Sequence, residues 1–547
     1  MLFAISLLSL GTLALARPSA PRSLSCTAAT FEAFLASSNI TATVNSAQAI
    51  AANGTFEVTN NTAYPSSPTK LQALCAVEVN VTSEAGTHYS FGLFLPDAWN
   101  NRFLAVGNGG YAGGINYIDM GAGAGYGFAV MSTDTGHSGG FQETAWAYNN
   151  TESITDWGWR AMHGSTVASK ALINAWYGSA SEYNYFSGCS VGGRQGLRAL
   201  QLFPEDFDGV SAGAPAWWTT HNQLWAVKTL TYNYPANASH FIPSSMFNVI
   251  GAEVIKQCDP QDGVTDTIIS DPFRCNFNPL TLLCAPNVTE SCLIPDQIET
   301  LNKIYNDWVE TNQTYVFSHL LLGTEASWNN DVGTGSLATL ESQSGFAQDL
   351  MQLGDSWTFE DLTIETVELA DEINPGNATA DDFDLSPFYN RGGKLIHHHG
   401  LSDGTLATGS SLYFYTHVVR AIWEHGIDVD DFYRLFLIPG MEHCQSTPSN
   451  MNAPWYIAGA NQPASISTSL HSVPCFSDAK HDVILALMAW VENGTAPDSI
   501  IATKWVDDNT QAEVSRQRPI CPYPKEAKYN GTGDVDSADS WECATLY

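Results

Sequence analysis

Short apolar runs that end at turn residues recur between positions 88 and 140. They read HYSFGLFLP, RFLAVGNGG and GYGFAVMSTDTG, a pattern that is typical of strands. A helical pattern follows over 156–178, and YNYFSG at 183–188 indicates another strand. We interpret 191–203 as a helix and 208–215 as a strand. Strands that alternate with helices predict an α/β protein with a mostly parallel sheet and helices on both faces.

The alternation is lost after Pro215. Residues 220–387 carry four closely spaced cysteines and many aromatic residues. Strand-and-turn units return as GGKLIHHHG at 392–400 and DFYRLFLIPG at 431–440. We therefore predict one catalytic α/β domain, built from 17–219 and 388–547, that is interrupted by an inserted lid domain at 220–387.

The amino-terminal end predicts a secretory signal peptide. An apolar run ends in Ala14-Leu15-Ala16, a small-x-small cleavage pattern, so we expect residues 1–16 to be removed. The alternative is a buried amino-terminal helix. The run is too short to span a bilayer, and no later stretch is long and apolar enough. We expect a secreted, extracellular protein without a membrane partner.

Glycosylation motifs and cysteines agree with secretion. Eleven N-x-Ser/Thr motifs are candidate glycosylation sites: Asn39, Asn53, Asn60, Asn80, Asn149, Asn237, Asn287, Asn312, Asn377, Asn493 and Asn530. The chain also has eleven cysteines, most of which should pair in an oxidising compartment. The odd count leaves at least one free thiol or an intermolecular bridge.

Net charge narrows the class of partner. The chain has 22 basic and 56 acidic residues, which gives a formal charge of −34. Such a surface repels nucleic acid and anionic lipid, so we expect neither as a partner. We expect a neutral or cationic partner. We also expect the protein to be a monomer or a homodimer.

A nucleophile motif lies between the predicted strand at 183–188 and the predicted helix at 191–203. The residues from Gly188 to Gly192 read GCSVG and match G-x-S-x-G, in which a serine occupies a sharp turn that only flanking glycines can accommodate. The following helix would place its positive amino end beside a developing negative charge. The pattern predicts that Ser190 is a catalytic nucleophile.

Partners for this serine follow in the order expected for an α/β-hydrolase fold. Asp403 and His443 each come just after a later predicted strand, which completes the order Ser, acid, His. Cys444 follows His443 as Cys189 precedes Ser190, so a Cys189–Cys444 disulfide is sterically reasonable if the triad forms. The alternative, Cys189 as the nucleophile, needs a free thiolate in a secreted protein.

Backbone N–H groups should complete the oxyanion hole. One donor is expected from Val191, the residue after the nucleophile, and another from the glycine-rich loop after RFLAVG. Gly109 and Gly110 are the candidates, and the sequence leaves the choice open. Alternatively, these glycines serve only to turn the chain.

Six stretches together resemble the fungal tannase and feruloyl esterase family of secreted α/β-hydrolases. They are GCSVGGRQG, FPEDFDGVSAGAPA, CDPQDGVTD, GGKLIHHHGLSD, FYRLFLIPGMEHC and WVENGTAPD, and they span most of the mature chain. The resemblance implies a triad of Ser190, Asp403 and His443 and the adjoining Cys189–Cys444 bond. The stretch at 108–114 looks more like the feruloyl esterase branch than the tannase branch.

An acidic loop in the inserted segment suggests calcium. CDPQDGVTD places carboxylates at Asp259, Asp262 and Asp266 around a glycine turn, and Ca²⁺ takes about six to eight oxygen ligands. The spacing differs from an EF-hand, and an ordinary acidic turn is the alternative. The resemblance implies a structural calcium that is also held by the backbone carbonyls of Val264 and Ile268. No organic cofactor is expected.

Four further disulfides are predicted in addition to the Cys189–Cys444 bond. Two bridges would close short loops next to the acidic segment, and two more would join the remaining cysteines: Cys258–Cys275, Cys284–Cys292, Cys26–Cys75 and Cys521–Cys543. Cys475 is left unpaired.

Two further groups of residues have simpler interpretations. The consecutive histidines 397–399 cannot converge on zinc from a strand, because alternate side chains point to opposite faces, so we expect local packing and hydrogen bonding. Tryptophans of the insert could line a pocket for a planar phenolic acid, although aromatic side chains mostly fill cores: Trp217, Trp218, Trp225 and Trp328.

Together these features predict a serine carboxylic ester hydrolase. The resemblance implies phenolic acid esters, with feruloyl and other hydroxycinnamoyl esters of plant cell-wall polysaccharides first and galloyl esters as the alternative. The expected partner is a small aromatic ester or a feruloylated oligosaccharide. A non-catalytic glycan-binding protein on a hydrolase scaffold is the alternative of another class.

Overall fold

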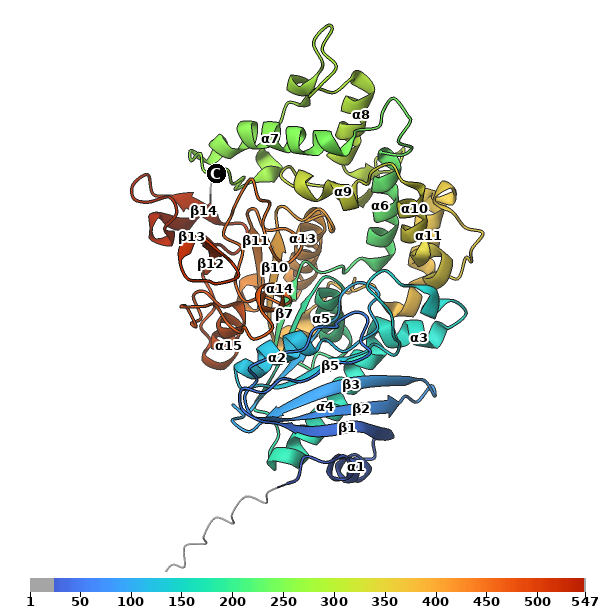
Figure 1. The fold of residues 1–547 in the computed structure, drawn as a ribbon, viewed down its shortest axis with the longest axis vertical. Coiled ribbons are helices and arrows are strands. Elements are labelled where there is room, and N and C mark those ends of the chain that lie inside the picture. Colours follow the sequence, from blue (N-terminus) through green and yellow to red (C-terminus); the bar gives the residue numbers. More distant parts are fainter. Residues whose placement is uncertain (1–23, 546–547) are drawn as a thin grey trace, which may run out of the picture.

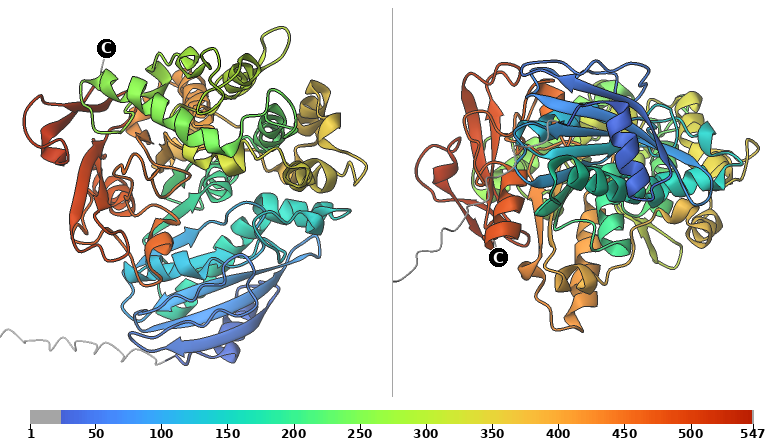
Figure 2. Two further views of the ribbon diagram at one scale, coloured as in Figure 1. Left: turned by 45° about the horizontal axis from the view of Figure 1, so that its top comes forward. Right: turned by 90° about the horizontal axis from the view of Figure 1, so that it is seen from below.

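The computed structural model describes residues 24–545 (Figure 1). The predicted signal peptide lies outside this range. Figure 2 shows the amino-terminal strands at one end of the molecule and the segment between β7 and β10 at the other, beyond the parallel strands.

A nine-stranded sheet forms the centre, in the order β1-β2-β3-β5-β4-β6-β7-β10-β11. The six strands from β5 to β11 run parallel to their neighbours, while β1, β2 and β3 join the edge in antiparallel fashion. The strands are β1 (Ala42–Ile50), β2 (Leu74–Thr82), β3 (His88–Pro96), β4 (Arg102–Val106), β5 (Ala129–Thr133), β6 (Tyr183–Cys189), β7 (Gly209–Gly213), β10 (Lys394–Gly400) and β11 (Tyr433–Ile438). The predicted α/β class is confirmed, and the antiparallel edge is an addition to the predicted parallel sheet.

Alternate side chains of the inner strands fill two separate cores. In β4, Phe103 and Ala105 face one core, whereas Leu104 and Val106 face the other. Because both faces are covered, almost all residues of these strands are buried. The helices that contribute to the first core are α1 (Ala28–Ser37), α4 (Ala161–Tyr177), α5 (Val191–Leu202) and α13 (Gly409–Trp423), and those of the second are α2 (Tyr117–Gly125) and α15 (Val483–Asn493).

The segment between β7 and β10 is mainly helical. Its helices are α6 (Thr219–Tyr232), α7 (Phe247–Cys258), α8 (Pro295–Ile304), α9 (Trp328–Asp331), α10 (Leu337–Gln343), α11 (Ile364–Ile373) and α12 (Ser386–Asn390), with one small hairpin of β8 (Trp308–Val309) and β9 (Tyr315–Phe317). Its core includes Trp225 and Leu320 and continues into Tyr111 and Val191 of the catalytic region. The segment therefore packs directly onto the loops that follow the strands. Its exact boundaries as a domain stay a prediction.

Shorter elements complete the described chain. Between β5 and β6, α3 (Thr151–Thr155) leads through a π-helical turn, Asp156–Arg160, into α4. After β11 come α14 (Gln462–Ile466) and four strands in two hairpins: β12 (Ile500–Trp505), β13 (Val514–Ile520), β14 (Glu526–Tyr529) and β15 (Trp541–Ala544).

All five expected disulfides are present: Cys26–Cys75, Cys189–Cys444, Cys258–Cys275, Cys284–Cys292 and Cys521–Cys543. Cys475 is an exposed free thiol. Among residues 24–545, no helix has the length and apolar character needed to cross a bilayer.

Candidate active site

Ser190 occupies a strained turn between β6 and α5. Its φ is 62° and its ψ is −123°, a conformation that a residue with a side chain rarely adopts. A side chain at Gly188 would come within 2.5 Å of Gly192 O, and one at Gly192 within 2.8 Å of Asn108 O. The glycines of the motif are therefore required by the close approach of three backbone segments, as expected for a nucleophile elbow.

Asp403 and His443 meet at the carboxyl ends of β10 and β11. His443 Nδ1 donates to Asp403 Oδ2 at 2.7 Å, and the Asp403 side chain is wholly buried. The backbone N–H groups of Thr405 and Leu406 both donate to Asp403 Oδ1 at 2.9 Å. These contacts hold the carboxylate still and leave Nε2 of His443 as the free ring nitrogen.

The two groups shift each other's pKa. Burial opposes the charge on the Asp403 carboxyl, but His443 and the hydrogen bonds from His399 and His443 hold its pKa well below its usual range. Burial lowers the pKa of His443, but the charge and hydrogen bond of Asp403 outweigh it, so that pKa is raised. The pair is arranged to stabilise an imidazolium.

His399 is a further partner of Asp403 that the sequence did not reveal. Its Nε2 lies 2.9 Å from Asp403 Oδ2, and its Nδ1 lies 2.7 Å from the Ser411 hydroxyl. His397 is also hydrogen-bonded to Ser411, because alternate residues of β10 point to the same side. The expectation of local packing for the consecutive histidines holds. Because His397 and His399 are two residues apart in a strand, their spacing could have indicated that they share one face.

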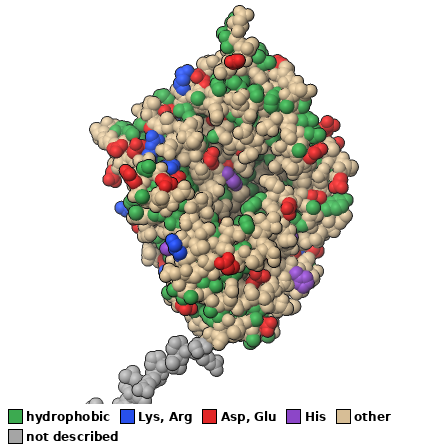
Figure 3. Space-filling view, viewed as in Figure 1, with side chains coloured by type: hydrophobic (Ala, Val, Ile, Leu, Met, Phe, Trp, Pro, Cys, Tyr) green, Lys and Arg blue, Asp and Glu red, His purple; other side chains and the backbone are tan. Residues whose placement is uncertain are grey.

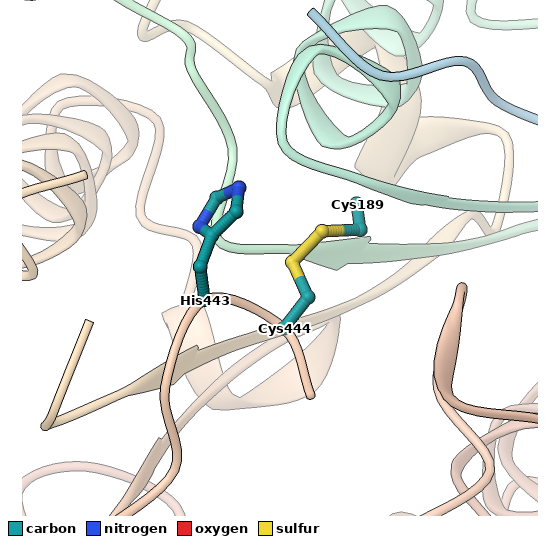
Figure 4. Close-up of side chains that lie close together, drawn as sticks. All are labelled: Cys189, His443 and Cys444. Carbon is teal, nitrogen blue, oxygen red and sulfur yellow. A yellow bond between two sulfur atoms is a disulfide. The ribbon is translucent and has the colours of Figure 1, made fainter. Parts of the chain in front are cut away.

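The Cys189–Cys444 disulfide joins the two candidate catalytic loops. A ring nitrogen of His443 and the two sulfur atoms lie within 4.8 Å of one another, and the imidazole stands beside the bond in Figure 4. Both cysteines are buried, with exposed fractions of 3% and 1%. The bond therefore places His443 beside the turn that carries Ser190, and Cys189 is not a free thiol.

Ser190 opens onto a cavity of about 480 Å³. Gly110 and Val191 line it from the catalytic region, and Trp225 and Asp331 line it from the inserted segment. Figure 3 shows a hollow near the middle of this face with a histidine at its edge. Of the tryptophans singled out in the sequence, Trp225 reaches this cavity.

Other predicted pocket residues lie elsewhere. Trp217 and Trp328 are buried core residues, with exposed fractions of 1% and 0%. Trp217 and Trp218 both line a different cavity. Of the four predicted tryptophans, Trp225 therefore lines the Ser190 cavity, and Trp328 lines neither cavity.

The glycine-rich loop after β4 is held by a tyrosine. The N–H of Gly109 donates to Tyr64 Oη at 2.7 Å, whereas Gly110 lines the Ser190 cavity. Burial raises the pKa of Tyr64, so its hydroxyl remains neutral. Of the two glycines that the sequence left open, Gly110 is the one that faces the cavity with Val191. Tyr64 lies far away in the sequence, in a segment without a recognisable motif.

The acidic loop contains hard oxygen ligands that are already engaged by the protein. The carboxylates of Asp259, Asp262 and Asp266 accept N–H groups of the same loop, and Asp266 also pairs with Arg518. Burial raises the pKa of Asp259, and repulsion from the other two carboxylates adds to the rise.

Within residues 24–545, Cys189, His443 and Cys444 are the sole three residues of metal-ligand types whose ligand atoms all lie within 4.8 Å of one another, and their disulfide prevents the two cysteines from binding a metal. The loop carboxylates suit a hard cation in type and charge. Their ligand atoms do not all lie within 4.8 Å of one another, so a bound cation would have to bring them closer together. The carbonyls of Val264 and Ile268 belong to the same loop.

Known proteins are similar to this chain in both sequence and fold. The family model described as tannase and feruloyl esterase matches residues 75–544. The chain belongs to this family. It is 35% identical over 453 residues to a protein named probable feruloyl esterase B-2 from Aspergillus flavus, covering 82% of this chain and 84% of the relative.

Solved structures of related proteins support the same family. Feruloyl esterase B from Aspergillus oryzae superimposes with a TM-score of 0.83 at 31% identity, over 94% of this chain and all of that chain. Tannin acyl hydrolase from Aspergillus niger has the same fold, with a TM-score of 0.71 at 22% identity and 95% coverage of both chains. This member of the family is therefore a carboxylic ester hydrolase with the α/β-hydrolase fold.

Proposed function

We propose that this enzyme hydrolyses esters of phenolic acids, feruloyl and related hydroxycinnamoyl esters first, with Ser190, His443 and Asp403 as its catalytic triad. The observation that carries the proposal is the hydrogen bond between buried Asp403 and partly buried His443, next to a disulfide that reaches the strained turn at Ser190. The names of the similar proteins, feruloyl esterase B among them, support the substrate class.

In this mechanism the Ser190 hydroxyl attacks the ester carbonyl. His443 Nε2 accepts the hydroxyl proton as the bond forms, and Asp403 stabilises the resulting imidazolium through Nδ1. The raised pKa of His443 suits this task, because the ring must hold the proton and then pass it to the leaving alcohol. Water then attacks the acyl-enzyme with the same histidine as the base, which releases the phenolic acid and restores Ser190.

Two backbone N–H groups would bind the oxyanion. Val191 is the first residue of α5, where N–H groups have no partner within the helix. Gly110 lies across the same cavity. Together with the positive end of α5, these donors would stabilise the tetrahedral intermediate.

Replacement of Ser190 tests the mechanism directly. In Ser190→Ala protein, kcat for methyl ferulate should fall by about 10⁶, because the oxygen that forms the acyl-enzyme is gone. Ser187→Ala, which removes a buried hydroxyl from the same strand, is the matched control and should remain active. Circular dichroism should show the same fold for both variants. Wild-type turnover by Ser190→Ala protein would refute the mechanism.

A galloyl ester hydrolase is the second candidate, because the family description covers both activities. Turnover of methyl ferulate, caffeate, p-coumarate, sinapate and gallate under one set of conditions separates the two. A non-catalytic glycan-binding protein would leave Ser190 unreactive towards a fluorophosphonate label.

We also propose a structural calcium ion in the acidic loop, held by Asp259, Asp262 and Asp266 with the carbonyls of Val264 and Ile268. The ion would supply positive charge that offsets the repulsion among the three carboxylates. Secretion after removal of residues 1–16 and glycosylation at the Asn-x-Ser/Thr motifs are part of the same proposal, which the disulfides support.

A further inference from the structure

A second cavity lies on the opposite side of the segment that follows β7. Its volume is about 240 Å³, and none of its lining residues lines the Ser190 cavity. Ala216 and Gln223 face the Ser190 cavity, whereas Trp218 and Thr220 face the second one. The chain between residues 216 and 223 therefore separates two distinct cavities.

One wall of the second cavity is aromatic and firmly held. Trp218 lies 5.0 Å from Tyr413 and 5.1 Å from Trp217, measured between ring centroids. Trp217 Nε1 donates to Ser410 O, and the Tyr413 ring stacks on Tyr315 at 5.1 Å. Trp218 and Tyr413 are partly exposed. This wall offers a rigid apolar surface that costs little conformational entropy on binding.

The opposite wall is polar and contains no basic side chain. It is formed by Asp371, Asn374, Thr379 and Asp381. Thr379 is only 2% exposed, and its hydroxyl has no hydrogen-bond partner in the structure. Because a buried hydroxyl without a partner is unfavourable, this wall has the character of a site that a ligand completes.

We propose that this cavity binds one pyranose ring of a neutral sugar chain. The apolar C–H face of a pyranose can pack on aromatic rings, and its hydroxyls can donate to carboxylate and amide oxygens and accept from Thr379. The volume is below the range of about 300–1,000 Å³ that is typical of drug-sized ligands, which suits a single ring.

Other ligand classes fit less well. Two carboxylates with no basic residue among the lining side chains oppose a phosphate or a uronic acid. A cation fits less well because Asp371 already pairs with His221, and the amide of Asn374 is already hydrogen-bonded to Asn377 and to the N–H of Thr379. The side chains of Asp371 and Thr220 are also already hydrogen-bonded to each other.

The same chemistry could come from two sources. One is a neutral plant polysaccharide, and this choice of ligand depends on the proposed function. The other is a glycan of the protein itself, because Thr379 is the third residue of the motif Asn377-Ala378-Thr379 and Asn374 Nδ2 lies 3.4 Å from Asn377 Oδ1.

Calorimetric titration of the Asn377→Gln protein, which cannot carry this glycan, tests the site. The probes are xylohexaose and N,N′-diacetylchitobiose, and saturable binding of at least one is expected. Asp381→Asn and Tyr413→Ala should each weaken that binding by about tenfold or more, since each removes a direct contact. Asp382→Asn, an exposed neighbour outside the cavity, is the matched control and should bind normally.

Comparison with the glycosylated protein identifies the source. Equal binding by both proteins assigns the cavity to an external sugar chain, and binding that appears only after Asn377→Gln assigns it to the protein's own glycan. If neither probe binds the Asn377→Gln protein, or if Asp381→Asn and Tyr413→Ala leave the affinity unchanged, the proposal is wrong. Ser190→Ala introduced into the Asn377→Gln protein should leave binding of the probes unchanged, so failure of the triad and failure of this site are distinguishable.

Discussion

Asp403 accepts hydrogen bonds from two imidazoles, and in the proposed mechanism this arrangement sets the pH at which His443 can act as a base. The buried carboxylate stays ionised because His399 and His443 both contact Oδ2 while two backbone N–H groups contact Oδ1. The negative charge that results raises the pKa of His443 above its ordinary value of 6.5. Asp403 thereby orients the imidazole of His443 and makes it a stronger proton acceptor, as the proposed mechanism requires.

The acid side of the pH profile should reflect this shift. A base must be unprotonated, so kcat/KM should fall as the pH is lowered through the raised pKa of His443, with a midpoint above 6.5. In Asp403→Asn protein the charge that raises the pKa is gone while burial remains, so the midpoint should move to lower pH. Activity should also fall by about 10⁴.

Profiles of kcat/KM against pH for methyl ferulate, measured on both proteins, check this prediction. A midpoint that stays in place after Asp403→Asn would show that the titrating group is not His443.

At the scale of elements, the Cys189–Cys444 bond connects the end of β6 with the loop after β11. These two elements are 255 residues apart in sequence, and the bond adjoins both Ser190 and His443. Gly440 adopts a φ of 70° and begins the turn that carries His443 away from β11. Because a displacement of about 1 Å can cost a factor of 10² in rate, a covalent link at this position should matter for catalysis as well as for stability.

Removal of this bond should therefore affect two quantities. Cys189→Ala/Cys444→Ala protein should lose about 2–5 kcal/mol of unfolding free energy, and its kcat should fall more than its KM changes. Cys26→Ala/Cys75→Ala protein lacks a bond between the chain before α1 and β2. It should lose stability but keep its kcat. Guanidinium unfolding and steady-state kinetics distinguish the two pairs, and an equal loss of kcat in both would contradict a positioning role.

At the scale of the whole molecule, the acidic loop connects the inserted segment to the carboxyl-terminal strands. Asp266 pairs with Arg518 of β13, and Arg518 lies 3.8 Å from the ring centroid of Trp541 in β15. Arg516 also donates to the backbone carbonyl of Asp266. These contacts therefore link the conformation of the acidic loop to the carboxyl-terminal strands, which are distant in sequence.

Calcium removal should lower the stability of the folded chain without altering the chemistry at Ser190. At a free calcium concentration of about 100 times Kd, bound ion should add about 2.7 kcal/mol to the unfolding free energy. Thermal unfolding with and without a chelator measures this difference, and Asp262→Asn should abolish it. Identical unfolding temperatures for wild-type protein with calcium and with chelator would rule out the site.

Local sequence motifs were sufficient for the inner strands, the nucleophile elbow and the order of Ser190, Asp403 and His443. Each depends on neighbouring residues, such as alternating apolar positions or glycines that permit a sharp turn. The antiparallel edge was harder to predict, because most residues of β1 are partly or fully exposed and its pattern is weakly apolar.

The sequence by itself determined the family resemblance, the α/β class and the candidate triad, and it suggested five cysteine pairs that the structure contains. Only the tertiary structure decided that His399 supports Asp403, that Tyr64 engages Gly109 and leaves Gly110 to face the cavity, and that Trp218 and Thr379 meet at a second cavity. The physical reason is that these contacts join residues far apart in the chain. Their positions depend on how the inserted segment and the loops pack together, and no local pattern of residue types encodes that packing.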